Sequence, residues 1–283
     1  TLNFILVKNF GQNLINPNCS KQLIILTKER GVMEKDKIFK VLKLPILVYN
    51  FILLMFNKLV AQVHYLDPSD NTRKRIISSL VMIPIALFAI FSSQKLFIFL
   101  VIMVAVLMAF EWAEMSRKMP DKKKWRLIGF FYIAIPLYCA VSIRILDNEI
   151  LFWMFAIIWA TDIFAFFAGK SLGGAKIAPA ISPNKTWSGL IGGVVASMGI
   201  GIISAMIFPG SIIFFLVISI LISIVEQISD LVESKFKRIF GVKDSGDIIP
   251  GHGGVLDRLD GMILVAPLVW IIIFLFPAQF GLI

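Results

Sequence analysis

The amino-acid sequence predicts an all-α, polytopic integral membrane protein with about seven to eight transmembrane helices. The chain has 283 residues, of which 58% are hydrophobic and 16% are charged, and its mean hydropathy is +0.86. A soluble globular domain has about half of its residues apolar and about a quarter charged, so it could not bury this much apolar surface. The apolar residues also come in runs of roughly 16–22, about the length that crosses a ~30 Å hydrocarbon core.

Seven apolar segments from Ile76 onward are predicted to span the membrane. They cover residues 76–91, 96–112, 127–143, 151–168, 187–208, 212–229 and 261–276. An eighth span over 45–61 stays open, because the polar residues within it equally suit an amphipathic helix on the membrane surface. Residues 71–283 are therefore the predicted membrane-embedded domain. Residues 1–70 form an N-terminal extension whose place in the native protein stays open, since Met33 offers an internal start.

The basic residues that follow Ile76 gather in alternate loops. The connections 113–126, 169–186 and 230–260 are rich in lysine and arginine, whereas the intervening loops hold only Lys95 and Arg144. Seven spans place all of the basic loops on one face, which the positive-inside rule assigns to the cytoplasm. The net charge of +10 therefore predicts contact with lipid head groups and phosphates, and no nucleic acid, because the basic residues form no face with interleaved aromatics.

A first polar region runs from Trp159 to Gly192. It places Asp162 inside an aromatic-rich span, where a central charge costs about 2.5–3.5 kcal/mol on insertion scales. The glycines and lysines that follow could bring backbone N–H groups and positive charge to a phosphate. A plain loop, with Ser182-Pro183-Asn184 capping the next helix, explains the segment at least as well. The glycines of the span 187–208 are predicted to allow close helix packing.

A second and more specific polar region joins the last two spans. Five of its residues lie three or four positions apart and so share one helical face: Glu226, Asp230, Glu233, Ser234 and Lys237. Asp257 and Asp260 are three residues apart and would point the same way on a helix that starts near them. Carboxylates at the mouth of a membrane bundle suit Mg²⁺, which binds them together with substrate phosphates. We therefore expect a magnesium site here, and a second cation stays open.

His252 lies between glycines in the same region and has two interpretations. The imidazole could act as a base or a ligand, or it could fix the turn by hydrogen bonding. Both interpretations stay open from the sequence.

The second region resembles the signature of the phosphatidate cytidylyltransferases. The resemblance is carried by Ser234-Lys235-Phe236-Lys237-Arg238, Lys243-Asp244, Gly246, Ile249-Pro250 and His252-Gly253-Gly254-Val255-Leu256-Asp257-Arg258-Leu259-Asp260. The stretch from Trp159 to Trp187 is also similar to the family, although Ser188 stands where the family often has a glutamate. The resemblance covers residues 73–276 and leaves residues 1–70 outside.

The resemblance implies a nucleotidyltransferase of phospholipid biosynthesis in the bacterial inner membrane, with a cytoplasm-facing funnel. It implies CTP and phosphatidic acid as substrates, CDP-diacylglycerol and pyrophosphate as products, and a divalent metal centre held by Asp230, Asp257 and Asp260. The implied catalytic residues are these aspartates with Lys185 and Arg258. The implied substrate-binding residues are Ser234, Lys237, Arg238, Lys243, Asp244, His252, Gly253, Gly254 and Asp162. The residues do not distinguish a monomer from a homodimer.

Three other classes of membrane protein use similar residues. A CDP-alcohol phosphotransferase begins its motif with Asp-Gly and contains an Ala-Arg pair, whereas Asp260-Gly261 ends the cluster here and the pair is missing. A CTP-dependent lipid kinase would release CDP instead of pyrophosphate. A secondary transporter would need essential charges near the middle of the membrane, but the charges here gather toward one side.

Overall fold

The computed structural model describes residues 84–246, 248 and 253–283. These residues belong to one compact unit, Met55–Ile283. The N-terminal extension, the open span 45–61, the first part of the predicted span 76–91 and His252 lie outside the described residues. Residues 84–91 of that span are helical.

Six helices of the described part are long and apolar enough to cross a membrane. They are α5 (Gln94–Met115), α6 (Lys122–Leu146), α7 (Asn148–Leu172), α8 (Trp187–Ile207), α9 (Ile212–Ile239) and α10 (Leu256–Leu275). Short 3₁₀ turns follow α5 (Ser116–Lys118) and α10 (Pro277–Phe280). These helices confirm the all-α polytopic fold. They correspond to the last six predicted spans, and the main difference is that α9 continues through polar residues to Ile239 instead of ending near 229.

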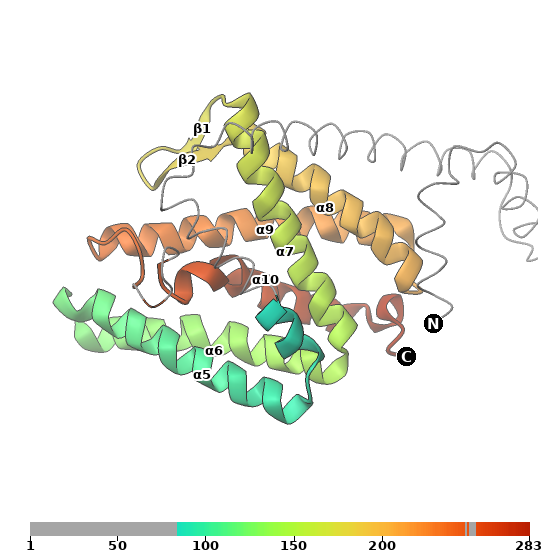
Figure 1. Ribbon diagram of the computed structural model, residues 1–283, viewed down its shortest axis with the longest axis horizontal. Helices are drawn as coiled ribbons and strands as arrows, with labels where there is room; N and C mark the ends of the chain where they lie inside the picture. The colour runs from blue at the N-terminus through green and yellow to red at the C-terminus, as the bar shows by residue number, and fades with distance from the viewer. Residues whose placement is uncertain (1–83, 247, 249–252) are drawn as a thin grey trace, which may run out of the picture. The chain divides into compact units, whose positions relative to one another are not determined.

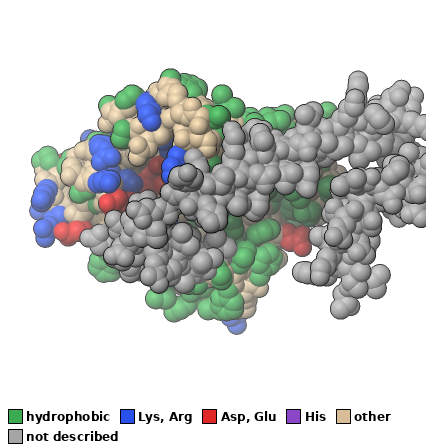
Figure 2. All heavy atoms as spheres, turned by 45° about the horizontal axis from the view of Figure 1, so that its top comes forward, with side chains coloured by type: hydrophobic (Ala, Val, Ile, Leu, Met, Phe, Trp, Pro, Cys, Tyr) green, Lys and Arg blue, Asp and Glu red, His purple; other side chains and the backbone are tan. Residues whose placement is uncertain are grey.

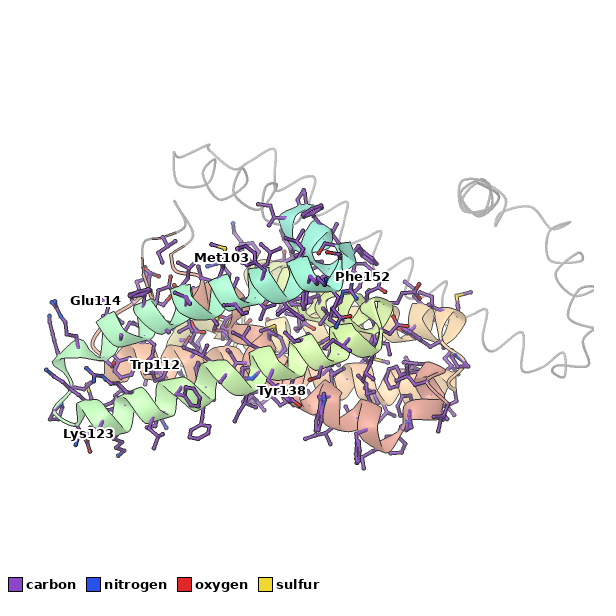
Figure 3. All side chains as sticks on the ribbon, turned by 90° about the horizontal axis from the view of Figure 1, so that it is seen from below. Met103, Trp112, Glu114, Lys123, Tyr138 and Phe152 are labelled. Atoms are coloured by element: carbon purple, nitrogen blue, oxygen red, sulfur yellow. The ribbon has the colours of Figure 1, made fainter. Side chains whose placement is uncertain are left out.

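Most helices pack against the helix next to them in the chain, and α10 lies between α9, which precedes it, and the sequence-distant α6. α7 packs on α8, α8 on α9, α9 on α10, α10 on α6 and α6 on α5 (Figure 1). Fully buried apolar side chains such as Met154, Phe215 and Val265 fill the interior. Large apolar side chains also cover the outside, and Figure 3 shows Met103 and Tyr138 pointing outward from α5 and α6. An apolar surface of this extent suits surrounding lipid.

Glycines let α7 and α8 approach closely. A Cβ added at Gly192 would lie 2.4 Å from the Cβ of Ala168, and one at Gly189 would lie 2.8 Å from the carbonyl oxygen of Ala165. Neither distance leaves room for a side chain, so the predicted packing role of these glycines is confirmed.

The connection between α7 and α8 is a small β-hairpin instead of the plain loop expected from its sequence. Strand β1 (Lys176–Ala178) pairs antiparallel with β2 (Ser182–Thr186), with Lys176 opposite Thr186. The predicted Ser182-Pro183-Asn184 cap was wrong, because Thr186 Oγ1 accepts the hydrogen bond from the Gly189 N–H at 3.1 Å and so caps α8. The hairpin places Lys185 on β2, where its ammonium reaches α9.

The three basic connections meet at one end of the described helices. Glu111 near the end of α5 accepts hydrogen bonds from the backbone at the start of α10, and Arg238 of α9 donates to the Ile181 carbonyl of the hairpin at 3.2 Å. Figure 3 shows Glu114 and Lys123 at this end and Phe152 at the other. In Figure 2 blue and red side chains gather on the left of the visible face, beside the hairpin. The described bundle therefore has one strongly polar end.

Candidate active site

A first cluster of polar side chains surrounds Lys185 and connects the hairpin to α9. The Lys185 ammonium is ion-paired with Asp230 and donates a hydrogen bond to Gln227 Oε1 at 3.0 Å. Gln227 Nε2 in turn donates to Glu226 Oε2 at 3.0 Å, and both of these side chains are buried. Asp162 of α7 lies close enough for the charge of its carboxyl group to act on Glu226 and Lys185. We call these five residues the Lys185 cluster.

The surroundings of Lys185 keep its amine charged. Burial lowers the pKa of Lys185, but the negative charges of Asp230 and Glu226 outweigh burial and hold the pKa above the usual 10.5. The side chain keeps 15% of its surface exposed. Lys185 therefore presents a permanent positive charge at neutral pH that a phosphate can approach.

A second cluster surrounds Lys237 and connects α9 to the start of α10. Lys237 Nζ lies 2.6 Å from Asp257 Oδ1 and 3.1 Å from Glu233 Oε1. The other oxygen of Asp257, Oδ2, accepts hydrogen bonds from the Ser245 N–H at 2.8 Å, the Ser245 hydroxyl at 2.9 Å and the Gly254 N–H at 2.9 Å. We call these five residues the Lys237 cluster. Asp257 thus fixes two parts of the α9–α10 connection and also places a carboxylate in the first turn of α10, where the helix dipole favours it.

Glycines allow the backbone to come this close to Asp257. A Cβ on Gly253 would lie 2.6 Å from Asp257 Oδ2, and the residue has φ of +81°, which side chains disfavour. A Cβ on Gly254 would lie 2.1 Å from Ser245 Oγ. The two glycines are therefore required by the geometry of the Lys237 cluster itself.

Glu111 also belongs to this part of the site, and the sequence analysis missed it. Its carboxylate accepts hydrogen bonds from the Val255 N–H at 2.7 Å, the Leu256 N–H at 2.8 Å and the Ser245 hydroxyl at 3.2 Å. Only 4% of Glu111 is exposed. The available signal was its position directly after an apolar run, where a carboxylate needs a partner, but its partners are more than 130 residues away in sequence.

Asp260 lies one turn further along α10 and faces α9. The Ser229 hydroxyl donates to the Asp260 carbonyl and accepts from the Leu264 N–H at 3.2 Å. In an undisturbed helix these two backbone groups would bond to each other. Ser229 therefore contacts both ends of one backbone turn of α10 at the level of Asp260, whose own Oδ1 accepts from the Gly261 N–H at 2.8 Å.

The remaining predicted residues lie around the two clusters. The Ser234 hydroxyl donates to Asp230 Oδ1 at 3.3 Å. Arg238 donates to backbone carbonyls of the hairpin and of Val242. Three further residues are exposed on the polar end: Lys243, Asp244 and Arg258. The structure thus brings Lys185 to Asp230 and Lys237 to Asp257, whereas within the described part of the chain Lys243, Asp244 and Arg258 make no hydrogen bond or ion pair with either cluster.

The carboxylates fit a metal ion in chemical type. Among the described residues, no three His, Cys, Asp or Glu side chains converge as ligands. Mg²⁺ needs only one or two carboxylates when phosphates and water complete its shell. Asp230 and Asp257 are each faced by a lysine ammonium, and Glu226 Oε1 and Glu233 Oε2 are buried with no hydrogen-bond partner in the described part of the chain. These oxygens are hard donors of the kind that Mg²⁺ prefers.

Comparison with known proteins points to one family. Residues 73–151 and 126–276 match the Cytidylyltransferase family, and the matched part contains both clusters. The chain is 41% identical over 216 residues to the phosphatidate cytidylyltransferase of Rickettsia bellii, covering 72% of this chain and 91% of that protein. It is 38% identical over 219 residues to that of Rickettsia felis, covering 74% and 95%. It is 42% identical over 181 residues to that of Brucella suis, covering 61% and 63%.

Proposed function

Because the chain belongs to the cytidylyltransferase family, we propose that it is a phosphatidate cytidylyltransferase. It transfers the cytidylyl group of CTP to phosphatidic acid and so forms CDP-diacylglycerol and pyrophosphate. The observation that carries this proposal is the pair of lysine–aspartate contacts, Lys185 with Asp230 and Lys237 with Asp257, at the polar end of an apolar bundle. One substrate is a lipid and both carry phosphates, so the site needs an apolar surround and fixed positive charge.

The reaction needs little help from a general base. A phosphate oxygen of phosphatidic acid is already anionic, and it forms a bond to the α-phosphorus of CTP while the bond from that phosphorus to the bridging oxygen breaks. Pyrophosphate leaves with the electron pair. The barrier is the repulsion between two anions, which positive side chains relieve. Lys185 and Lys237 are buried cations suited to this role.

We propose that Asp230, Asp257 and Asp260 are the carboxylates available to a Mg²⁺ ion, of which one or two would bind it together with CTP phosphates, since no three converge among the described residues; a second cation is left open. Mg²⁺ would supply charge neutralisation at the phosphates of CTP. In the structure an ammonium stands against Asp230 and another against Asp257, in the place a cation would take beside each carboxylate. Each lysine therefore has two uses: it neutralises its aspartate before substrate binds, and it is free to turn to a phosphate afterward.

The exposed basic residues at the same end complete the proposal. Lys243 and Arg258 are exposed there, and Arg238 ties the hairpin to α9. We assign to them the first electrostatic contacts with CTP. This attraction should weaken as salt is added, because exposed charges are screened. Asp162 is the member of the Lys185 cluster that comes from α7, and its carboxyl group helps to set the charge around Lys185.

The protein is a multi-pass membrane protein, and its relatives are bacterial. We propose that it lies in the bacterial inner membrane with the polar end toward the cytoplasm, since all three basic connections meet there. CTP is then available on the correct side. Both clusters are built from one chain, so the site does not need a second subunit, and it is compatible with a homodimer as well as with a monomer.

The deciding experiment incubates the purified full chain with labelled CTP and phosphatidic acid. We expect lipid-linked cytidine and pyrophosphate in equal amounts. CDP with a newly phosphorylated lipid would identify a CTP-dependent lipid kinase, and cytidine transfer without added phosphatidic acid would rule out the proposed acceptor. Lys176→Ala serves as the control variant, because Lys176 is exposed on β1 and contacts neither cluster among the described residues.

A further inference from the structure

Glu111 is not one of the residues proposed to contact phosphate, but its carboxylate contacts the α9–α10 connection that carries the Lys237 cluster. It comes from α5, which the sequence motifs do not include, and it is buried against the α9–α10 connection. One oxygen, Oε1, accepts the Val255 N–H, and Oε2 accepts the Leu256 N–H and lies 3.2 Å from the Ser245 hydroxyl. Three donors from two separate stretches of the connection therefore converge on one side chain.

The contacts of Glu111 reach Asp257 through one shared residue. The Ser245 hydroxyl lies 2.9 Å from Asp257 Oδ2 and 3.2 Å from Glu111 Oε2, and its single hydrogen can serve either carboxylate. Glu111 and Asp257 thus hold the same hydroxyl from opposite sides. The two N–H groups that donate to Glu111 belong to the residue before α10 and to the first residue of α10. At this end of a helix the backbone N–H groups have no partner within the helix.

Two glycines let the backbone approach the Glu111 side chain closely. A Cβ on Gly246 would lie 3.2 Å from Glu111 Cγ, and a Cβ on Gly254 would lie 2.6 Å from both Glu111 oxygens. Gly246 lies in the stretch of the connection that follows α9, and Gly254 lies in the stretch that precedes α10. The backbone therefore closes around Glu111 as tightly as it closes around Asp257.

We infer that Glu111 is a positioning residue, which fixes the start of α10 and Ser245 and thereby sets the orientation of Asp257 for the transferase reaction. The inference rests on the proposed function for its catalytic consequence. Reach is what matters in this role, because the carboxylate must contact three donors at the end of a three-carbon side chain. Glutamine keeps that reach and one acceptor oxygen, whereas aspartate keeps the charge and withdraws by one methylene.

The first test measures kcat and both KM values for Glu111→Gln, Glu111→Asp and Glu111→Ala in the purified full chain. Residues that orient a ligand through hydrogen bonds contribute about 10–100-fold in activity. Among the three variants we expect kcat to be highest for Glu111→Gln, lower for Glu111→Asp and lowest for Glu111→Ala. The KM for CTP should change less than kcat. Asp retaining more activity than Gln would overturn the inference, because charge and not reach would then be the requirement. Glu114→Gln is the matched control, since Glu114 lies one turn later on α5 and is exposed.

The second test reads the connection without any substrate. Lys243 is exposed in the α9–α10 connection, and the segment 118–124, which runs from the α5–α6 connection into the first turn of α6, also carries exposed lysines. We expect Glu111→Gln to speed tryptic cleavage after Lys243 and to leave cleavage within 118–124 unchanged. Unchanged cleavage after Lys243, or equal acceleration at both places, would refute local positioning. If the wild-type chain had no transferase activity, the proposed function would be wrong. Faster cleavage after Lys243 alone in Glu111→Gln would in that case still support the anchoring by Glu111.

Discussion

Replacing Lys185 with alanine should separate its structural use from its catalytic use. The ammonium is ion-paired with Asp230 and bonded to Gln227 Oε1, and the two charged side chains are only 15% and 23% exposed. Removing one member of a buried pair leaves an uncompensated charge and costs about 3–5 kcal/mol. Since this pair keeps some exposure, we expect a loss of stability at the lower end, about 3 kcal/mol. Asp230 and Glu226 would then lose the cation that faces both of them.

The kinetic effect of Lys185→Ala should exceed what the loss of stability explains. A preorganised positive group that stabilises developing charge contributes about 10²–10³ in kcat. We expect a fall of that order in kcat and a higher KM for CTP, because the lysine contacts phosphate both before and during transfer. Lys185→Arg should recover only part of the activity, since a planar guanidinium does not replace a compact ammonium.

Three further measurements decide the interpretation of Lys185. The double variant Lys185→Ala with Asp230→Asn should regain thermal stability in detergent, because the unpaired charge is gone, but it should stay inactive. Lys176→Ala should match the wild type in both assays. Equal, negligible kinetic effects at Lys185 and Lys176 would refute the reasoning and remove the hairpin from the active site. Activity restored in the double variant would reduce Lys185 to a partner of Asp230.

The remaining predictions concern the pH dependence, two site residues and the orientation. The pKa of Lys185 is raised, so its stabilisation should be complete below pH 10.5 and be lost only as the pH rises through the higher folded-state value; thermal midpoints of wild type and Lys185→Ala should differ equally from pH 7 to 9.5 and converge above that range. Asp257→Asn should abolish turnover while the purified chain stays folded, and near-normal activity at saturating Mg²⁺ would contradict the assignment. Gly254→Ala should lower kcat at least tenfold, about 1.4 kcal/mol, because its Cβ would lie 2.1 Å from Ser245 Oγ, and wild-type kinetics would show that the connection can shift without consequence. A cysteine at Lys123 should react with a membrane-impermeant reagent in inverted vesicles and not in intact cells, and rapid labelling from outside would reverse the orientation.

The helices were predictable because each apolar run has the length of a membrane span. The polar ends were harder to place. Residues 230–239 continue α9 although they carry charges, because Lys237 pairs with both Glu233 and Asp257 in the interior. The hairpin was missed because its strands have only three and five residues and contain Pro183 and Asn184, which are typical of loops.

The candidate site was predictable in its residue types and not in its pairings. The motif placed Asp257 and Asp260 together on one helix, and spacing suggested a shared direction. In the structure Asp257 contacts Lys237 and the α9–α10 connection, whereas Asp260 lies where the Ser229 hydroxyl contacts the backbone of α10. For Glu111 the local signal was its position after an apolar run, which does not identify its partners. Tertiary contacts of this kind link residues that no short-range spacing rule relates.

The length of α9 determines how the enzyme meets its lipid substrate. Its 28 residues rise about 42 Å, which exceeds a ~30 Å hydrocarbon core, and Asp230 lies about 27 Å from the helix start. For a helix along the bilayer normal that begins at one edge of this core, the Lys185 cluster then lies close to the opposite edge, just below the glycerol and phosphate groups of the lipids. Phosphatidic acid can react while its acyl chains remain among their neighbours. Enzyme velocity should therefore follow the mole fraction of phosphatidic acid within a detergent micelle or bilayer, and diluting the lipid with inert amphiphile at constant total phosphatidic acid should slow the reaction.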